Sequence, residues 1–231
     1  MRAAIFIDGG YILQQMKIAK VTLDYERLSD YFLAPVRANL PVDLMRCYFY
    51  YCAPWMSPEP KEEDLKRMET HNKFVAETEN IDRWQVRLGK LEKRWDGTKE
   101  YYEQKRVDVL LSCDMVRHAA AGHIQHAILV AGDSDFIPAV TAAKEAGVTI
   151  SVWCGPPNTI HKDLVTLADE VHRFDIARIP RKAPEKTESP KQTVETRVEP
   201  LKPAAAPTVK TPKTAEPIPK APTRRRSRSR K

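Results

Sequence analysis

The chain has 231 residues, of which 42% are hydrophobic and 30% are charged, and its formal net charge is +7. This length supports one sizeable hydrophobic core but hardly two large ones. No apolar stretch approaches the roughly 20 residues of a membrane-spanning helix, and the first apolar run, in "MRAAIFIDGG", is far too short for a signal peptide. We therefore expect a soluble cytoplasmic protein that has no membrane partner.

Positive charge is concentrated at the end of the chain. Residues 181–231 contain fifteen Lys or Arg and five Glu, a net charge of +10, so the rest of the chain carries −3. The same segment has nine of the eighteen prolines and no aromatic residue, a composition that buries too little apolar surface to offset its conformational entropy. The sequence predicts a folded domain over residues 1–178 and a disordered basic tail over residues 179–231.

The tail ends in "APTRRRSRSRK", where six of the last eight residues are cationic. Clustered cations attract phosphate backbones. We therefore expect RNA binding by Arg224, Arg225, Arg226, Arg228, Arg230 and Lys231. The alternatives are a solvated arm that aids solubility, a targeting signal and a segment that binds anionic lipid.

The cysteines predict neither a zinc site nor a disulfide. None of them forms a Cys-x-x-Cys pair, and most lie in apolar segments. Free thiols in a reducing compartment are the better interpretation of Cys47, Cys52, Cys113 and Cys154.

The first half of the chain predicts two strands and two helices. Residues 3–8 are an apolar run that ends in an acid, and a helix follows through Tyr11 to Met16. Residues 44–51 are rich in the aromatic residues that favour strands. Residues 58–80 predict a polar helix whose inward side chains are Leu65, Met68 and Phe74.

The second half alternates strands with helices. Residues 84–95 alternate apolar and polar side chains as a half-exposed strand does. A buried helix over residues 107–121, ended by Gly122, precedes a buried strand at 126–131 and a helix to Ala146 with Pro138 in its first turn. The remaining elements are strands at 148–153 and 170–175 and a short helix at 162–168. This order predicts a doubly wound, mostly parallel sheet over residues 1–178.

Two carboxylates follow the most apolar of these strands. In "HAILVAGDSDFIPAV", an unbroken apolar run leads to Gly132, Asp133 and Asp135. Such a strand is buried on both faces of a parallel sheet, and ligands bind at the carboxyl edge of that kind of sheet. Helix capping, with Ser134 or Asp135 as the expected cap, explains one acid. A second acid beside it indicates a ligand site, because the like charges repel.

Further acids converge on the same edge. Asp8 ends the first strand, so it lies beside Asp133 if the two strands are neighbours. On the helix over residues 107–121, a spacing of six residues places Asp108 and Asp114 about 120° apart. Asp114 adjoins the apolar stripe of this helix and needs a partner there. Asp108 is either an acid of the first helical turn or an outer ligand.

Crowded carboxylates repel one another unless a cation intervenes. Hard oxygen ligands without His or Cys select Mg²⁺ or Mn²⁺ over zinc. Such ions polarise a phosphoryl oxygen and generate hydroxide from bound water, so the chemistry needs no nucleophilic side chain. The sequence therefore predicts phosphodiester hydrolysis that depends on Mg²⁺ or Mn²⁺.

Five segments in this order resemble the NYN domain, specifically its LabA-like branch in the PIN-like nuclease superfamily: "FIDGG", "KRVDVLLSCD", "LVAGDSDF", "AGVTISVW" and "LADEVHRF". The resemblance spans residues 1–176. It implies a three-layer α/β/α PIN-like (Rossmann-like) fold with a central, mostly parallel sheet, and a metal-dependent ribonuclease site. The family's catalytic acids fall on Asp8, Asp114, Asp133 and Asp135, and Asp108 joins them as a fifth metal ligand. Many relatives have Asn three residues after the first acid, where this chain has Tyr11.

Other readings of the motifs are weaker. His118, His123 and His126 lack further zinc-ligand spacing, and a haloacid-dehalogenase-type phosphatase would need an acid at position 10, which is Gly. No P-loop pattern is present. A rim at Asn158, Thr159, His161 and Lys162 is either an RNA contact or a plain loop.

Two function classes remain open. The first is a metal-dependent ribonuclease that acts on RNA and is assisted by its basic tail. The second is a catalytically weak or inactive NYN-type RNA-binding or regulatory module. The complete set of acids favours the first class and Tyr11 favours the second, while a homodimer is compatible with either.

Overall fold

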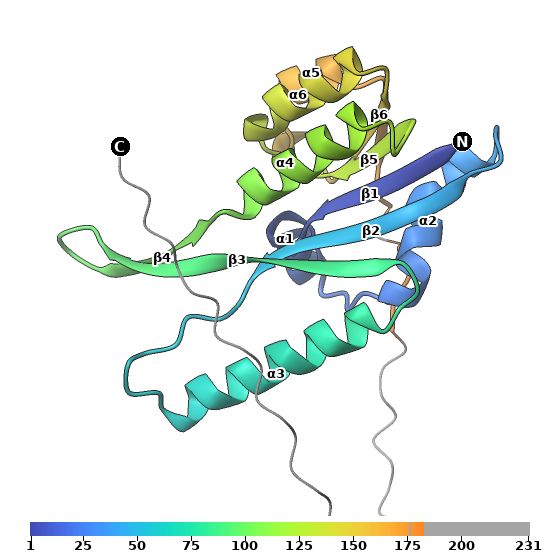
Figure 1. Ribbon diagram of the computed structural model, residues 1–231. Helices are drawn as coiled ribbons and strands as arrows, with labels where there is room; N and C mark the ends of the chain where they lie inside the picture. Colours follow the sequence, from blue (N-terminus) through green and yellow to red (C-terminus); the bar gives the residue numbers. More distant parts are fainter. Residues whose placement is uncertain (176, 183–231) are drawn as a thin grey trace, which may run out of the picture. The chain divides into compact units, whose positions relative to one another are not determined.

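The computed structural model describes residues 1–175 and 177–182. Within these residues, seven strands form one sheet in the order β4-β3-β2-β1-β5-β6-β7 (Figure 1). All neighbours are parallel except β3 and β4, which form an antiparallel hairpin that extends beyond the rest of the sheet. The strands are β1 (Arg2–Asp8), β2 (Asp43–Cys52), β3 (Trp84–Trp95), β4 (Glu100–Lys105), β5 (His126–Val130), β6 (Thr149–Cys154) and β7 (Glu170–Arg173).

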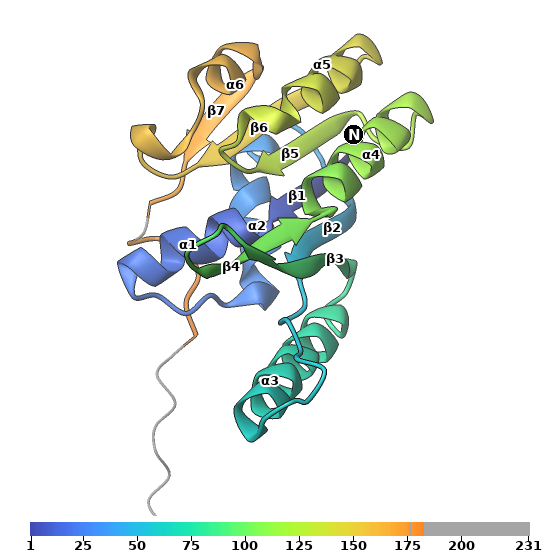
Figure 2. The same cartoon turned by 90° about the vertical axis from the view of Figure 1, so that its left-hand side faces the viewer.

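Helices cover both faces of the sheet (Figure 2). One face carries α1 (Gly9–Ala19), α2 (Tyr25–Arg37) and α3 (Glu62–Glu79). The other carries α4 (Val107–Ala120), α5 (Ile137–Glu145) and α6 (Lys162–Leu167). Short 3₁₀ turns, η1 (Ser134–Phe136) and η2 (Pro157–Thr159), follow β5 and β6. The predicted α/β fold, a mostly parallel sheet between two helical layers, is confirmed.

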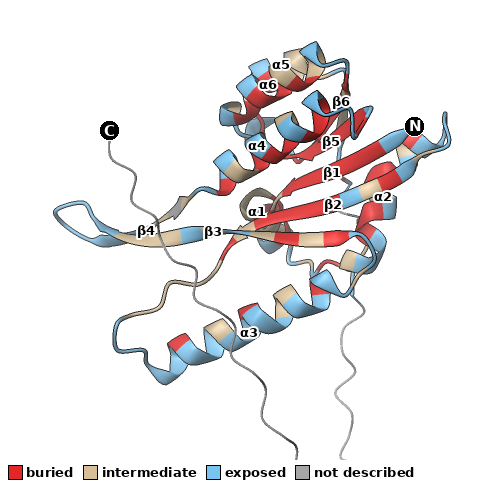
Figure 3. Ribbon diagram, in the orientation of Figure 1, coloured by how far each residue is buried: buried red, intermediate tan, exposed pale blue. Residues whose placement is uncertain are grey.

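The core lies on both sides of the central strands. Ile5 and Ile7 of β1 pack in the layer of α1 and α2, whereas Ala4 and Phe6 pack in the layer of α4 and α5. Figure 3 shows buried residues along β1 and β2. Successive side chains of a strand point to opposite faces of the sheet, and both faces are covered here. A central strand must therefore be apolar throughout, as its sequence indicated.

The structure also contains two elements that the sequence did not predict. These are α2 and the strand β4, which pairs with β3. The prediction that Leu65 of α3 faces inward was wrong, because this side chain is 53% exposed. The helix buries His71 and Thr78 instead. All four cysteines are free, and all but Cys113 are buried.

The chain stays on the domain beyond residue 178. Ile179 is buried, the Asp24 N–H donates to the Pro180 carbonyl (3.0 Å), and the Lys182 N–H donates to the Thr22 carbonyl (3.1 Å). The folded part therefore includes residues that were expected in the tail. The cations expected to bind RNA, Arg224 to Lys231, lie outside the described residues. No helix in the described part of the chain is long and apolar enough to cross a membrane.

Candidate active site

Asp8 ends β1 and begins α1. Its Oδ1 accepts a hydrogen bond from the Tyr11 N–H (3.1 Å), so the carboxylate caps the helix that follows it. The pKa of Asp8 is raised to about 6, first by burial and then by the nearby charges of Asp108 and Asp133, against the lowering effect of the backbone hydrogen bonds. The strand β5, which leads to Asp133, is the neighbour of β1, so the condition under which Asp8 lies beside Asp133 is met.

The charges of two more acids, Asp108 and Asp133, act on Asp8, whereas Asp135 acts on Asp108 and lines a separate cavity between α4 and α5. Asp133 follows β5 and caps η1, because its side chain accepts the Asp135 N–H at 3.1 Å. The prediction that Ser134 or Asp135 is the cap was therefore wrong. Asp108 lies in the first turn of α4. Although the residue is exposed, surrounding protein atoms displace part of its hydration, and this partial desolvation and the charges of Asp133 and Asp135 raise its pKa. Elements far apart in the sequence thus bring Asp8, Asp108, Asp133 and Asp135 into one electrostatic neighbourhood.

These four acids share a second property. Among the ion pairs of the described residues, none involves Asp8, Asp108, Asp133 or Asp135. No Lys, Arg or His of the described residues therefore neutralises their negative charge.

A cleft of about 540 Å³ opens at this edge of the sheet. Asp8, Asp108 and Asp133 line it, and the loop after β6 contributes Asn158 and His161. No Lys or Arg is among its lining residues. Three of the residues expected to form a rim, Asn158, Thr159 and His161, do line the cleft, whereas Lys162 does not.

Glycine is required where the chain turns beneath the cleft. A Cβ at Gly132 would lie 2.0 Å from the Thr159 carbonyl oxygen and 2.6 Å from Cε2 of Tyr11. Any larger residue would push the loop that carries Asp133 away from the loop after β6. The Gly between β5 and the two acids therefore serves close packing at the cleft.

Tyr11 also lines the cleft, and its hydroxyl ties two segments together. It forms a hydrogen bond with Thr159 Oγ1 (2.9 Å) and accepts the Gly155 N–H (2.9 Å). Its ring packs edge-on against Phe174. Tyr11 thus fixes the loop after β6 against the start of α1, a structural role that the sequence did not predict.

Asp114 lies elsewhere. Its Oδ2 accepts the Tyr50 hydroxyl (3.0 Å) and lies 3.3 Å from Arg87 Nε, while Oδ1 accepts Arg117 Nη2 (2.7 Å). It does not line the cleft, because six residues along α4 carry it about 9 Å and about 120° away from Asp108. The expected partner of Asp114 is present, but the structure does not bring this acid to the other four. Its assignment as a metal ligand stays a prediction.

The donor chemistry of the cleft fits a hard cation, although the side chains are not gathered around one point. No group of three or more His, Cys, Asp or Glu positioned to hold a metal ion occurs in residues 1–175 and 177–182. Asp108 and Asp133 are exposed, so rotation of their side chains toward Asp8 is unhindered by burial. His118 and His126 are buried and hydrogen-bonded to Tyr48 and Ser151, which accounts for them without zinc.

A parallel sheet between helical layers, with acids at the carboxyl ends of its central strands, is the arrangement of a PIN-like nuclease-type domain. The model of the NYN domain family matches residues 2–175, and the chain belongs to this family. A solved structure of a protein of unknown function from Vibrio parahaemolyticus RIMD 2210633 is similar, with a TM-score of 0.51 and 19% identity over 75% of this chain and 93% of that chain. This likeness concerns the fold alone. None of the curated proteins that were compared matches the chain.

Proposed function

We propose that this NYN protein belongs to the LabA-like branch and is a ribonuclease dependent on Mg²⁺ or Mn²⁺. Asp8, Asp108, Asp133 and Asp135 are its proposed metal ligands. One observation carries the proposal: Asp8, Asp108 and Asp133 line one cleft at the carboxyl edge of the sheet, the charge of Asp135 reaches Asp108, and none of the four acids makes an ion pair with a described residue. A protein gains no stability from unpaired like charges, so a ligand that neutralises them explains their placement.

In this proposal the residues of the cleft have separate roles in metal binding, phosphate binding and positioning of the loop. Asp8, once ionised, and the exposed Asp108 and Asp133 bind the cation. A bound divalent ion would supply a polarised phosphoryl oxygen and a more acidic water. Asn158 and His161 hold donors on the loop after β6, where a phosphate entering the cleft would lie. Tyr11 holds that loop in place through its hydroxyl.

Asp114 takes a different part in this proposal. Its contacts with Arg87, Arg117 and Tyr50 join α4 to β2 and β3, and α4 carries Asp108. We therefore assign Asp114 the role of a positioning residue that holds the first turn of α4 near Asp8.

Two observations favour the second class of function, a regulatory RNA-binding module. No three-ligand group is assembled among the described residues, and the Tyr11 hydroxyl is engaged within the protein. Such a module would bind RNA through the same cleft and the tail but cut slowly or not at all.

Cleavage of labelled single-stranded RNA in Mn²⁺ and in EDTA separates the two classes. The nuclease proposal predicts products in Mn²⁺, their absence in EDTA and their absence with Asp133→Asn. RNA that is bound but stays intact in Mn²⁺ would favour the regulatory module.

A further inference from the structure

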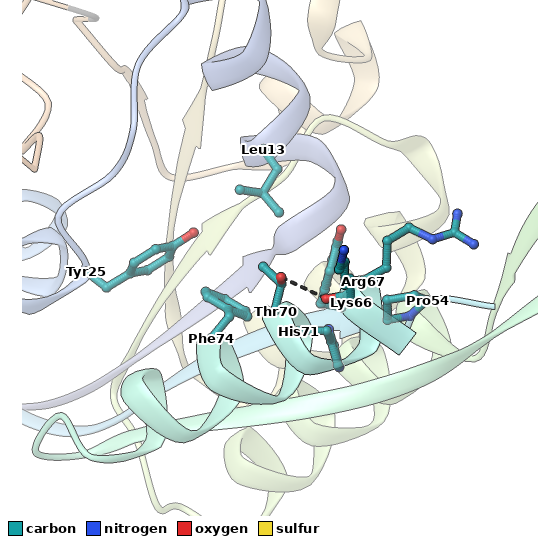
Figure 4. A pocket seen from close by; sticks show the side chains of 9 residues that line it. Leu13, Tyr25, Pro54, Lys66, Arg67, Thr70, His71 and Phe74 are labelled. Carbon is teal, nitrogen blue, oxygen red and sulfur yellow. Dashed lines mark hydrogen bonds between the residues drawn. The ribbon is translucent and has the colours of Figure 1, made fainter. Parts of the chain in front are cut away.

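A second cavity borders α1, on a face of the helix next to the one that borders the cleft. It has a volume of about 450 Å³, and Tyr25, Tyr51 and Phe74 form aromatic walls. Figure 4 shows Leu13 of α1 facing Thr70 and Phe74 of α3 across it. The cavity is mainly apolar, and the cations at its mouth, Lys66 and Arg67, are the charged residues among those that line it.

Polar groups in its wall have no partner within the described protein. The hydroxyls of Tyr25 and Tyr51 make no hydrogen bond with a described residue, and burial raises the pKa of both, so they stay protonated donors. His71, which is 7% exposed, also lines the cavity, and its buried Nε2 has no hydrogen-bond partner among the described residues. Unpaired polar groups beside aromatic faces are the features of a ligand site.

The cations at the mouth remain available to an anion. Lys66 pairs with Glu62 (2.7 Å) and Arg67 with Asp64, but the side chains of Lys66 and Arg67 are 69% and 56% exposed. The Lys66–Glu62 pair is exposed on both sides and therefore weak, and Arg67 keeps over half of its side chain in solvent while it contacts the largely buried Asp64, so a phosphate can approach both cations. Neither Glu62 nor Asp64 lines the cavity.

The position of the cavity relates it to the cleft. Gln14 of α1 lines the cleft and the adjacent Leu13 lines the cavity, so the two border neighbouring faces of one helix, about 100° apart. One extended strand of RNA can therefore enter both. A duplex cannot, because its bases are stacked and paired and do not reach a side pocket.

We propose that this aromatic cavity binds one unpaired base of the RNA strand whose phosphodiester lies in the cleft, with Lys66 and Arg67 contacting the adjacent phosphates. The inference rests on the proposed function for the strand in the cleft and adds a binding site for one of its bases. Aromatic faces and free hydroxyl donors suit a base, and the cations suit its phosphates.

Filling the cavity tests this proposal. Thr70 is exposed on α3 and lines the cavity, so Thr70→Trp places an indole in it without disturbing the core. Asn72→Trp is the matched control, because it adds the same side chain to an exposed position of α3 that does not line the cavity. Binding of fluorescent single-stranded RNA by the full chain is measured in EDTA, so that cleavage is not required.

We expect Thr70→Trp to weaken binding by about tenfold, the effect of losing one stacked base, while Asn72→Trp binds as the parent does. RNAs with one abasic ribose at successive positions should bind the parent about tenfold more weakly at one position, and Thr70→Trp should abolish that difference. Equal binding by Thr70→Trp and the parent, or no RNA binding by the parent, overturns the inference. Cavity-dependent binding without cleavage in Mn²⁺ would overturn only the nuclease proposal.

Discussion

Asp8→Asn removes a carboxylate whose pKa is raised by folding. The pKa of Asp8 rises from 3.8 to about 6 on folding, mainly through burial. At about 1.36 kcal/mol per pKa unit, the ionised side chain lowers the free energy of unfolding by at most about 3 kcal/mol at neutral pH. Asn caps a helix as well as Asp does, so the variant keeps the hydrogen bond to Tyr11.

The pH dependence has a defined sign. Because the folded state holds the proton of Asp8 more tightly than the unfolded state, stability from this group is greatest below about pH 4 and falls as the pH rises to about 6. Asp8→Asn lacks this fall. In EDTA at pH 7 we expect its melting temperature to exceed that of the parent, by at most about 6–12 °C at roughly 2–4 °C per kcal/mol for a domain of this size.

Circular dichroism melts between pH 4 and pH 8 measure this difference. Asp82→Asn is the control, because Asp82 is an exposed acid that makes no ion pair with a described residue. Equal melting temperatures of Asp8→Asn and the parent at pH 7, or parallel pH profiles, would refute the idea that burial and crowding disfavour the ionised carboxylate.

Other variants distinguish the proposed ligands from the supporting residues. In thermal melts with Mn²⁺, the parent should be stabilised by mass action and Asp133→Asn much less so; equal shifts would exclude Asp133 as a ligand. Asp114→Asn should lower the free energy of unfolding by about 2 kcal/mol in urea, since it disrupts a largely buried ion pair, and unchanged stability would refute its positioning role. Gly132→Ala should destabilise the fold and slow cleavage, which melts and rates would detect together. Deleting residues 183–231 should flatten the salt dependence of RNA binding by roughly 0.7 log units per lost phosphate contact, and an unchanged slope would assign the tail another partner.

The central strands and most of the cleft acids could be predicted from the sequence. An apolar run that ends in an acid fixes both the burial of a strand and the edge at which the acid lies, which holds for Asp8 and Asp133. The amphipathic pattern of α2 was available too, since Leu28, Phe32 and Val36 recur at helical spacing and are buried. Pro35 near its end obscured that pattern.

Other features depend on contacts between distant segments. The strand β4 has no apolar alternation, and its local signals are the adjacent Tyr101 and Tyr102 and the turn at Gly97, whose φ is +97°. The sequence indicated that Asp114 needs a partner but could not name Arg87 or Tyr50, which come from two other strands. The role of Tyr11 arises only when the fold brings the start of α1 against the loop after β6, and the aromatic cavity only when it brings β2, α1 and α3 together.

The central claim is that the unpaired acids of the cleft bind a divalent metal. Electron paramagnetic resonance of free Mn²⁺ during titration with the full chain measures this directly, because bound Mn²⁺ leaves the free-ion signal. We predict saturable binding by the parent and by Asp114→Asn, and its loss in Asp133→Asn. A free-ion signal that the parent does not reduce, or that Asp133→Asn reduces as strongly, would contradict the claim.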